Sequence, residues 1–281
     1  MAWYKNFLVE PGAKVDLKKI DPAETAGHES ETSKAEVDRN LERLRKAQYL
    51  LYADDSQSLL VVLQGLDASG KDGTIRHLFS GLNPQGTSVA AFKQPTEVEL
   101  AHDFLWRVHA KAPAKGDIVI FNRSHYEDVL VVRVHNLVPE SVWSKRYKVI
   151  NNFEKLLRRN RTTILKFYLH ISPEEQLRRF ERRLDDPMRQ WKISESDYAE
   201  REFWPQYIEA YEDAISLTST KRAPWYIIPS DHKWFRNLAI SQIVADTMDG
   251  MGLKVPPPRV NIDELRRKYH AAKSEAGGKQ N

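Results

Sequence analysis

An apolar strand that runs directly into a glycine-bearing turn constrains this chain more than any other feature of its sequence. Residues 59–63 read LLVVL, and they precede Gly65-x4-Gly70-Lys71 and an amphipathic helix predicted over 72–82. The loop amides, the lysine and the helix N-terminus then face one point, which favours bound phosphate. The Gly-x4-Gly-Lys pattern alone often occurs by chance. Its position between a predicted strand and a predicted helix is what favours a phosphate loop over an ordinary turn.

The parts of this loop have separate predicted roles. Gly65 lets the chain leave the strand sharply, and Gly70 lets backbone N–H groups approach phosphate oxygens without an intervening Cβ. Lys71 places an ammonium against the terminal phosphates. We therefore predict phosphate contacts from the following loop residues: Ala68, Ser69, Gly70, Lys71, Asp72 and Gly73.

Two carboxylates accompany the lysine. Asp72 occupies the position where nucleoside triphosphate loops carry the Ser or Thr that holds magnesium, and Asp67 lies inside the loop. Carboxylates can bind a divalent cation directly or through water. The pair predicts Mg²⁺, with Mn²⁺ as an alternative, together with an anionic substrate; a loop specialised for the terminal phosphates of ATP is less well supported.

The remaining pattern predicts a three-layer α/β fold with a parallel sheet and helices on both faces, because strand and helix patterns alternate along the chain. We expect a single domain over 1–281, with an N-terminal lead-in at 1–33, a lid at 178–200 and a disordered tail at 274–281. Strands are predicted at 59–63, 87–92, 117–121, 163–169 and 225–229, and further helices at 34–53, 96–109, 141–160, from 172, 196–217 and 232–250.

Composition excludes several classes of function. The chain has no cysteine, so disulfides, thiolate nucleophiles and cysteine-based zinc sites are absent. It has no apolar run near the roughly 20 residues of a membrane span and no signal-peptide pattern at its start, so a cytoplasmic protein is expected. The net charge of +4 is unevenly placed, with basic residues crowded at 145–161 and 178–192. These runs predict a polyanion surface, or alternatively two solvated helix faces.

A second group of polar residues follows the strand at 117–121. Asn122 stands where the strand beside a phosphate loop usually ends in an acid for magnesium, and Arg123 is placed to grip phosphates with two hydrogen bonds. His125, Glu127 and Asp128 follow at the carboxyl edge of the sheet, where open α/β folds bind ligands. An alternative for Glu127 and Asp128 is that they cap the next helix.

The basic run at 178–192 has the features of a mobile lid. Asp186-Pro187 interrupts it, which predicts a helix–turn–helix hairpin. A lid that closes positive charge over a phosphoryl group excludes water and stabilises developing charge. Arg179 and Arg189 are its predicted phosphate contacts, and the alternative is that these arginines are solvated and paired with neighbouring acids.

Five segments together resemble the family-2 polyphosphate kinases, in the right order from about residue 35 to 250. The resemblance implies a P-loop kinase core similar to thymidylate kinase, with phosphoryl transfer between inorganic polyphosphate and nucleotides in the presence of magnesium. The segments are GLDASGKDGTI, FKQPTEVEL, FNRSHYEDVLVVRVH, RRFERRLDDPMRQWKIS and APWYIIPSDHKWFRN.

The resemblance also implies roles for individual residues. Many members carry Asp where Asn122 stands; the Asn resembles the branch called class III, which phosphorylates both AMP and ADP. Asp67 and Asn122 are the expected metal ligands, although the neutral amide leaves the second magnesium weakly held. The expected catalytic residues are Asp67, Lys71, Arg123 and the lid arginine Arg183. The expected nucleotide contacts are Gln94, Asn122, Arg123, His125, Glu127 and Asp128.

The expected partners are inorganic polyphosphate and AMP, ADP or ATP, in a homo-oligomeric dimer or tetramer that binds neither nucleic acid nor membrane. Two rival functions stay open at this point. An ATP-dependent nucleoside monophosphate kinase would share the fold, and Asp72 and the long basic surface disfavour it. A non-catalytic binder of polyanions such as RNA would use the basic helices, and the dense set of acids, lysine and arginines disfavours that one.

Overall fold

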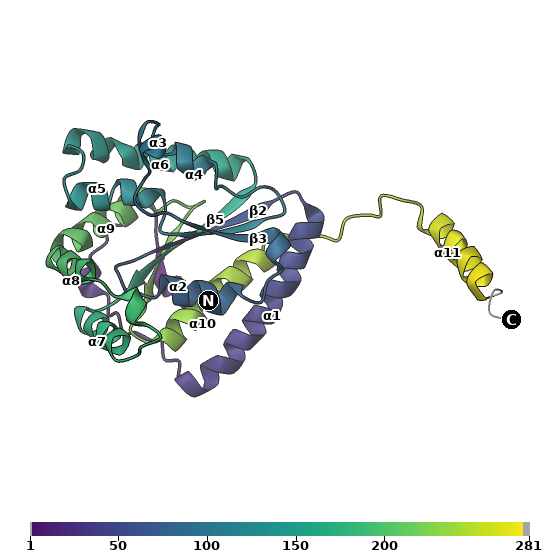
Figure 1. Ribbon diagram of the computed structural model, residues 1–281, viewed down its shortest axis with the longest axis horizontal. Coiled ribbons are helices and arrows are strands. Elements are labelled where there is room, and N and C mark those ends of the chain that lie inside the picture. The colour runs from purple at the N-terminus through teal and green to yellow at the C-terminus, as the bar shows by residue number, and fades with distance from the viewer. Residues whose placement is uncertain (1, 278–281) are drawn as a thin grey trace.

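Six strands form one sheet at the centre of the protein in this computed structural model, which describes residues 2–277 (Figure 1). Their order is β1-β6-β5-β2-β4-β3, and all neighbours are parallel except the antiparallel pair β1–β6. The carboxyl ends of β2, β4 and β5 therefore meet at one edge, where the phosphate loop leaves β2. The strands are β1 (Leu8–Val9), β2 (Ser58–Gln64), β3 (Thr87–Ala91), β4 (Ile118–Asn122), β5 (Thr162–His170) and β6 (Trp225–Pro229).

Helices cover both faces of this sheet (Figure 1). On one face lie α1 (Ser30–Asp54), α2 (Lys71–Phe79) and α10 (Lys233–Asp249); on the other lie α6 (Glu140–Arg159) and α9 (Trp204–Thr218). The shorter helices are α3 (Glu97–Leu100), α4 (Trp106–His109), α5 (Val131–Val134), α7 (Pro173–Leu184) and α8 (Glu195–Glu202). The 3₁₀ turns are η1 (Trp3–Phe7), η2 (Leu17–Lys19), η3 (Pro84–Gly86), η4 (His125–Asp128) and η5 (Gln190–Lys192).

Strand β2 shows why the sequence forms this sandwich. All of its residues are buried, which explains a continuous apolar run instead of an alternating one. Successive side chains point to opposite faces: Leu60 and Val62 join the core under α6 and α9, whereas Leu59 and Val61 join the core under α1 and α10. The strand is thus held from both sides, and the loop that follows it starts from a fixed point.

Each predicted strand is found in the structure. Two segments that were each predicted to form one helix are instead divided into two helices. The segment 96–109 forms two short helices, α3 and α4, because the Asp103 side chain accepts a hydrogen bond from the Leu105 amide and turns the chain between them. The segment 196–217 divides at Phe203 into α8 and α9, because Pro205 has no amide proton to continue one helix through that point.

The two ends of the chain differ from expectation. The predicted lead-in contributes a strand, since β1 pairs with β6 and the Leu17 amide donates to Glu212 Oε1 (2.8 Å) on α9. After α10 the chain extends away from the domain and ends in α11 (Ile262–Gly277) (Figure 1). The predicted disordered tail begins at Ser274, yet 274–277 belong to this helix; 278–281 lie outside the described residues.

Among residues 2–277, no helix combines the length and the apolar character needed to span a membrane.

We expect Leu44→Ala to lower the free energy of unfolding by about 2–5 kcal/mol. Leu44 is 0% exposed between α1 and the sheet, so the substitution leaves a cavity in the core on that face. Chemical denaturation measures the loss. Leu100→Ala is the control, because Leu100 is 68% exposed, and its effect should stay within about 0.5 kcal/mol. Equal losses in the two variants would contradict the packing described for α1.

Candidate active site

A glycine lies at each end of the phosphate loop. Gly65 and Gly70 have positive φ angles of 148° and 110°, which residues with a Cβ rarely adopt. A Cβ on Gly65 would lie 2.8 Å from the Leu169 carbonyl oxygen, and one on Gly70 would meet the end of the Arg236 side chain. Gly65 therefore needs glycine for space as well as for backbone conformation, whereas Gly70 needs it for its backbone conformation.

Lys71 is buried beneath this loop. Its Nζ donates to the carbonyl oxygens of Gly65 (2.6 Å) and Leu66 (3.2 Å), so the ammonium lies inside the curve of the loop. Burial, together with repulsion from Arg123, lowers the pKa of Lys71 to about 8. The charge is therefore held at a cost, which a bound anion would offset.

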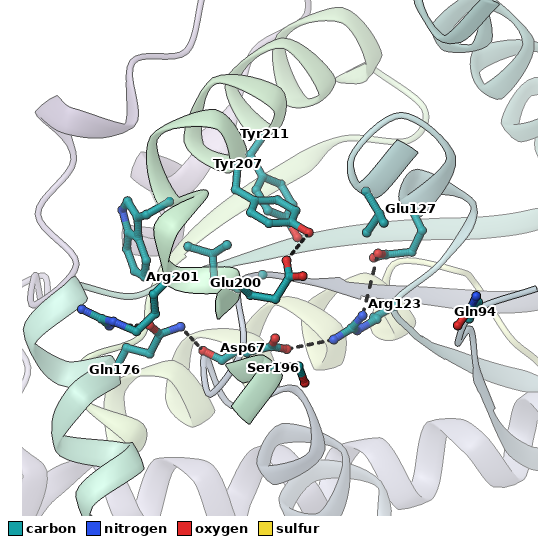
Figure 2. Close-up of a pocket in the computed structure, with 14 residues that line it drawn as sticks. Asp67, Gln94, Arg123, Glu127, Gln176, Ser196, Glu200, Arg201, Tyr207 and Tyr211 are labelled. Atoms are coloured by element: carbon teal, nitrogen blue, oxygen red, sulfur yellow. Dashed lines mark hydrogen bonds and ion pairs between the residues drawn. The ribbon is translucent and has the colours of Figure 1, made fainter. Parts of the chain in front are cut away.

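A pocket of about 380 Å³ opens between the loop, the end of β4 and helices α8 and α9 (Figure 2). Four of the residues predicted from the sequence line it: Asp67, Gln94, Arg123 and Glu127. The carboxyl ends of neighbouring parallel strands bring them together although they are far apart in the chain. The sequence therefore predicted one side of this pocket.

Arg123 lies at the centre of that side (Figure 2). Its Nη2 donates to Asp67 Oδ1 (2.8 Å), and its Nη1 lies 4.0 Å from Glu127 Oε2. Burial disfavours the charge, but Glu127 and Asp67 outweigh it and raise the pKa of Arg123. Burial also raises the pKa of Glu127, which Arg123 and Lys71 oppose. The guanidinium is thus permanently charged and aimed at the pocket between two acids.

Asp72 and Asn122 form a direct contact that the sequence did not reveal. Asn122 Nδ2 donates to Asp72 Oδ1 over 2.7 Å, joining the start of α2 to the end of β4. The metal site predicted at Asp67 and Asn122 is thus divided, since Asp67 pairs with Arg123 and Asn122 with Asp72.

The acids at this edge fit a magnesium ion that is held mainly by its substrate. In residues 2–277 no group of three or more His, Cys, Asp or Glu side chains converges as a metal cage. Mg²⁺ commonly keeps several waters and uses one or two carboxylates plus substrate phosphates. Asp67, in the phosphate loop, and Asp72, in the first turn of α2, supply such carboxylates.

Two predicted nucleotide contacts are not supported by the structure. His125 is fully buried, with Nε2 lying 3.3 Å from Glu154 Oε1, so its side chain does not reach the pocket. Asp128 is also buried and accepts a hydrogen bond from Arg146 Nη1 (3.1 Å), and it does not line the pocket. Burial raises the pKa of Asp128 to about 6. Both side chains pack within the fold because the 3₁₀ turn η4 points them inward.

Arg179, which the sequence predicts as a phosphate contact, donates its hydrogen bonds to groups of the protein itself. Its Nη1 donates to the carbonyl oxygens of Ala68 (2.8 Å) and Ser69 (2.9 Å), its Nε to Glu175 Oε1 (2.9 Å), and its Nη2 to the Ser230 carbonyl oxygen. These bonds occupy the donors of the guanidinium. Arg179 is therefore a brace that holds the outer side of the phosphate loop to α7 and to the end of β6.

The other lid arginines contact the lid itself. Arg183 Nη1 donates to the Lys192 carbonyl oxygen (3.0 Å) and lies 3.8 Å from Asp197 Oδ1. Arg189 is exposed and pairs with Asp186 (2.8 Å). Neither residue lines the pocket, so the catalytic role of Arg183 and the phosphate contact of Arg189 stay predictions.

Sequence reasoning missed a buried cation at the start of α10. Arg236 is 3% exposed beside Gly70, and among residues 2–277 its Nε and Nη2 donate only to the Asn237 amide oxygen (3.2 and 2.8 Å). In the described part of the chain no carboxylate pairs with it, and burial and Arg179 lower its pKa. Lys233, one turn earlier, also has its pKa lowered by burial and by neighbouring arginines. One sequence signal could have identified Arg236 and Lys233: both lie in the first turns of the helix that follows the last strand.

The far wall of the pocket was also missed, because it comes from α8 and α9 (Figure 2). Tyr207 donates its hydroxyl to Glu200 Oε2 (2.8 Å), which also lies 3.1 Å from His135 Nε2. Gln176 on α7 donates to the Asp67 carbonyl oxygen (2.8 Å) and accepts from Arg201. The lid helices are thus connected to the phosphate loop.

A parallel sheet with a phosphate loop after its central strand, arginine at the next strand end and a helical lid define a P-loop kinase. The chain belongs to the Polyphosphate kinase 2 (PPK2) family, which it matches over residues 27–256. A solved structure of polyphosphate kinase 2 from Arthrobacter aurescens TC1 superposes with a TM-score of 0.92 at 37% identity, covering 96% of this chain and 97% of that one.

Curated relatives carry related names. An AMP/ADP-polyphosphate phosphotransferase from Meiothermus ruber is 50% identical over 266 residues, which cover 93% of this chain and 98% of the relative. An ADP-polyphosphate phosphotransferase from Rhodopseudomonas palustris is 45% identical over 269 residues, which cover 90% of this chain and 92% of the relative. The similarity therefore extends over the whole domain and is not confined to the loop.

We expect Arg179→Ala to lower the free energy of unfolding by about 1–3 kcal/mol, because it leaves the loop carbonyls without their buried donor, while Glu175 keeps Arg178 and Arg182 as partners. Chemical denaturation tests this. Arg178→Ala is the matched control, since Arg178 is exposed and its one ion pair within the described part of the chain is with Glu175, and it should leave stability nearly unchanged. If the two variants unfold alike, Arg179 does not brace the loop.

We expect the affinity of the protein for tripolyphosphate to fall as the pH rises through about 8. The pKa of Lys71 is lowered to about 8, so its ammonium is present below that pH and is lost above it. Titration calorimetry between about pH 6.5 and 9.5 measures the change. Lys71→Arg keeps its charge across this range and should lack the transition. A wild-type affinity that stays constant to pH 9.5 would contradict the assignment.

Proposed function

We propose that this protein transfers phosphoryl groups from inorganic polyphosphate to AMP and to ADP, forming ADP and ATP. The observation that carries the proposal is the buried Arg236, which lies beside the phosphate loop and has an amide as its only described side-chain acceptor. A cation left in this state favours an anionic ligand at the same place. The names of the relatives that match nine-tenths of the chain support the choice of donor and acceptors.

The donor side of the site is proposed to lie along the loop and the start of α10. Lys71, Arg236 and Lys233 are the cations there, and burial lowers the pKa of each. A polyphosphate chain presents a charge on every phosphate and has no base or ribose to recognise. A cluster of cations is what such a donor needs.

The acceptor side is proposed to be the pocket in Figure 2. Arg123 would bind the nucleotide phosphates, while Trp204, Tyr207 and Tyr211 offer aromatic surface for the rest of the nucleotide. The attacking phosphate oxygen is already anionic, so the reaction needs no strong general base. Positioning and charge stabilisation then supply most of the rate, and a reaction between similar phosphoanhydrides is reversible.

Asp67 and Asp72 are the residues that would hold Mg²⁺, or Mn²⁺ in its place, with the Asn122 amide fixing Asp72. The bound ion would neutralise charge on the phosphates. Arg183 would add positive charge when the lid closes over the site. The family resemblance also supports a homo-oligomer, a dimer or tetramer, in the cytoplasm, with no role in binding nucleic acid.

The proposal is tested by incubating the purified protein with Mg²⁺, long-chain polyphosphate and AMP, without ATP, and separating the nucleotides by chromatography. We expect ADP to form first and ATP to follow. Lys71→Ala should lose about 100-fold or more in turnover, because it removes a fixed charge from the transferring phosphates. Lys268→Ala, on the exposed helix α11, is the control and should keep full activity.

The other outcomes distinguish the rivals. Product that forms only with ATP as donor would identify a nucleoside monophosphate kinase. Binding of polyphosphate with no product from either donor would identify a polyanion-binding protein.

A further inference from the structure

A buried ion pair lies beneath the turn that carries Arg123 and Glu127. Lys166 Nζ on β5 lies 2.7 Å from Glu154 Oε2 on α6, and the two side chains are 0% and 2% exposed. Tyr126 in η4 joins them, since its hydroxyl donates to Glu154 Oε1 (2.8 Å) and accepts from Lys166 Nζ (2.9 Å). The three groups thus hydrogen-bond to one another inside a largely apolar core.

The same network reaches the C-terminal end of α9, the helix that contributes to the opposite wall of the pocket. Lys166 Nζ also donates to the carbonyl oxygen of Thr218 (2.8 Å), the last residue of α9, and Trp225 Nε1 on β6 donates to Thr218 Oγ1 (2.9 Å). Helix α9 carries Tyr207 and Tyr211, which line the pocket. One buried cluster thus fixes both the turn with Arg123 and the end of the helix that faces it.

Stability alone does not account for this arrangement. Taking two charges out of water costs free energy that their attraction only partly returns, and well-packed apolar residues of similar volume often serve as well or better. In some proteins buried ionic groups specify geometry instead, because each hydrogen bond fixes a direction that apolar packing does not.

The geometry specified here is that of the catalytic turn. Tyr126 lies between Arg123 and Glu127 in the sequence, and the Arg123 backbone has a φ of 59°, a conformation that side-chain-bearing residues rarely adopt. Two contacts fix the turn. The Arg123 amide donates to the Leu63 carbonyl oxygen on β2 (3.1 Å), and the Tyr126 hydroxyl bonds to Glu154 and Lys166 in the core. A shift of that hydroxyl would turn both functional side chains.

We propose that Tyr126, Glu154 and Lys166 are positioning residues, which set the direction of Arg123 and Glu127 for the acceptor nucleotide without touching it. The proposal rests on the proposed function and adds to it a group of residues outside the pocket. The donor-side cations on α2 and α10 have no contact with this network, so the donor should be bound as before.

The test is Tyr126→Phe, which removes one hydroxyl and leaves Glu154 and Lys166 paired directly. We expect kcat/KM for AMP to fall about 10- to 100-fold with a raised KM for AMP and an unchanged KM for polyphosphate, since misplacement by about 1 Å can cost 100-fold in rate. Tyr168→Phe is the matched control. Tyr168 is buried on β5, and its hydroxyl has no hydrogen-bond partner among the described residues, so kinetics should not change.

A second variant separates positioning from stability. Glu154→Gln with Lys166→Met removes both charges together and avoids a lone buried ion. We expect it to melt close to the wild type and still to have the raised KM for AMP. Wild-type kinetics in Tyr126→Phe, or in the folded double variant, would overturn the proposal. A wild type with no polyphosphate-dependent activity would instead overturn the proposed function, so the two failures are distinguishable.

Discussion

Positive charge crowded at one edge of the sheet is the constraint on which the rest of the structure depends. Lys71, Arg123, Arg179 and Arg236 all lie around one loop, and they fall into two groups by the acceptors of their hydrogen bonds. Arg123 and Arg179 have carboxylate partners, whereas among the described residues Lys71 donates to backbone carbonyls and Arg236 to an amide. Two cations are thus fixed in place by acids, and two are left to be neutralised by whatever binds. The two cations paired with acids therefore belong to the scaffold, and the other two belong to the binding site.

The distinction between paired and unpaired cations also bears on how the predicted lid would move. At the base of α7, Gln176 and Arg179 bind the phosphate loop, so this end of the helix moves with the core. At its far end, Arg183 and Arg189 bind Lys192 and Asp186, all within the lid segment. Movement of that segment would therefore leave these internal pairs intact, but it would break the contacts that Glu200 makes with Tyr207 and His135 outside the segment.

Much of the fold could be predicted from the sequence, because the signals are local. The apolar run of β2, the glycines and lysine after it, and the polar residues that follow β4 were enough to place the loop and one side of the pocket. These residues end parallel strands, and such ends meet at one edge whatever the details of packing.

Side-chain direction could not be predicted, and it accounts for the errors in the site. Arg178 and Arg179 are neighbours on α7, yet one is exposed and the other is buried against the loop. Their positions on the helix differ by about 100°, which a basic run does not reveal. His125 was misplaced for a similar reason, since η4 buries His125, Tyr126 and Asp128 and directs only Glu127 of its four side chains to the pocket. Arg236 was missed because only the fold brings α10 to Gly70.

The two departures from the usual phosphate-loop pattern are one structural feature. Asp72 replaces the hydroxyl residue after the lysine, and Asn122 stands where an acid is usual; the structure places them 2.7 Å apart as donor and acceptor. An aspartate at 122 would set two carboxylates against each other at this distance, which needs a proton or a cation between them. The amide removes that repulsion and donates a hydrogen bond instead. The junction of α2 with β4 is therefore stable before any cation arrives, and Asp72 keeps its second oxygen for one.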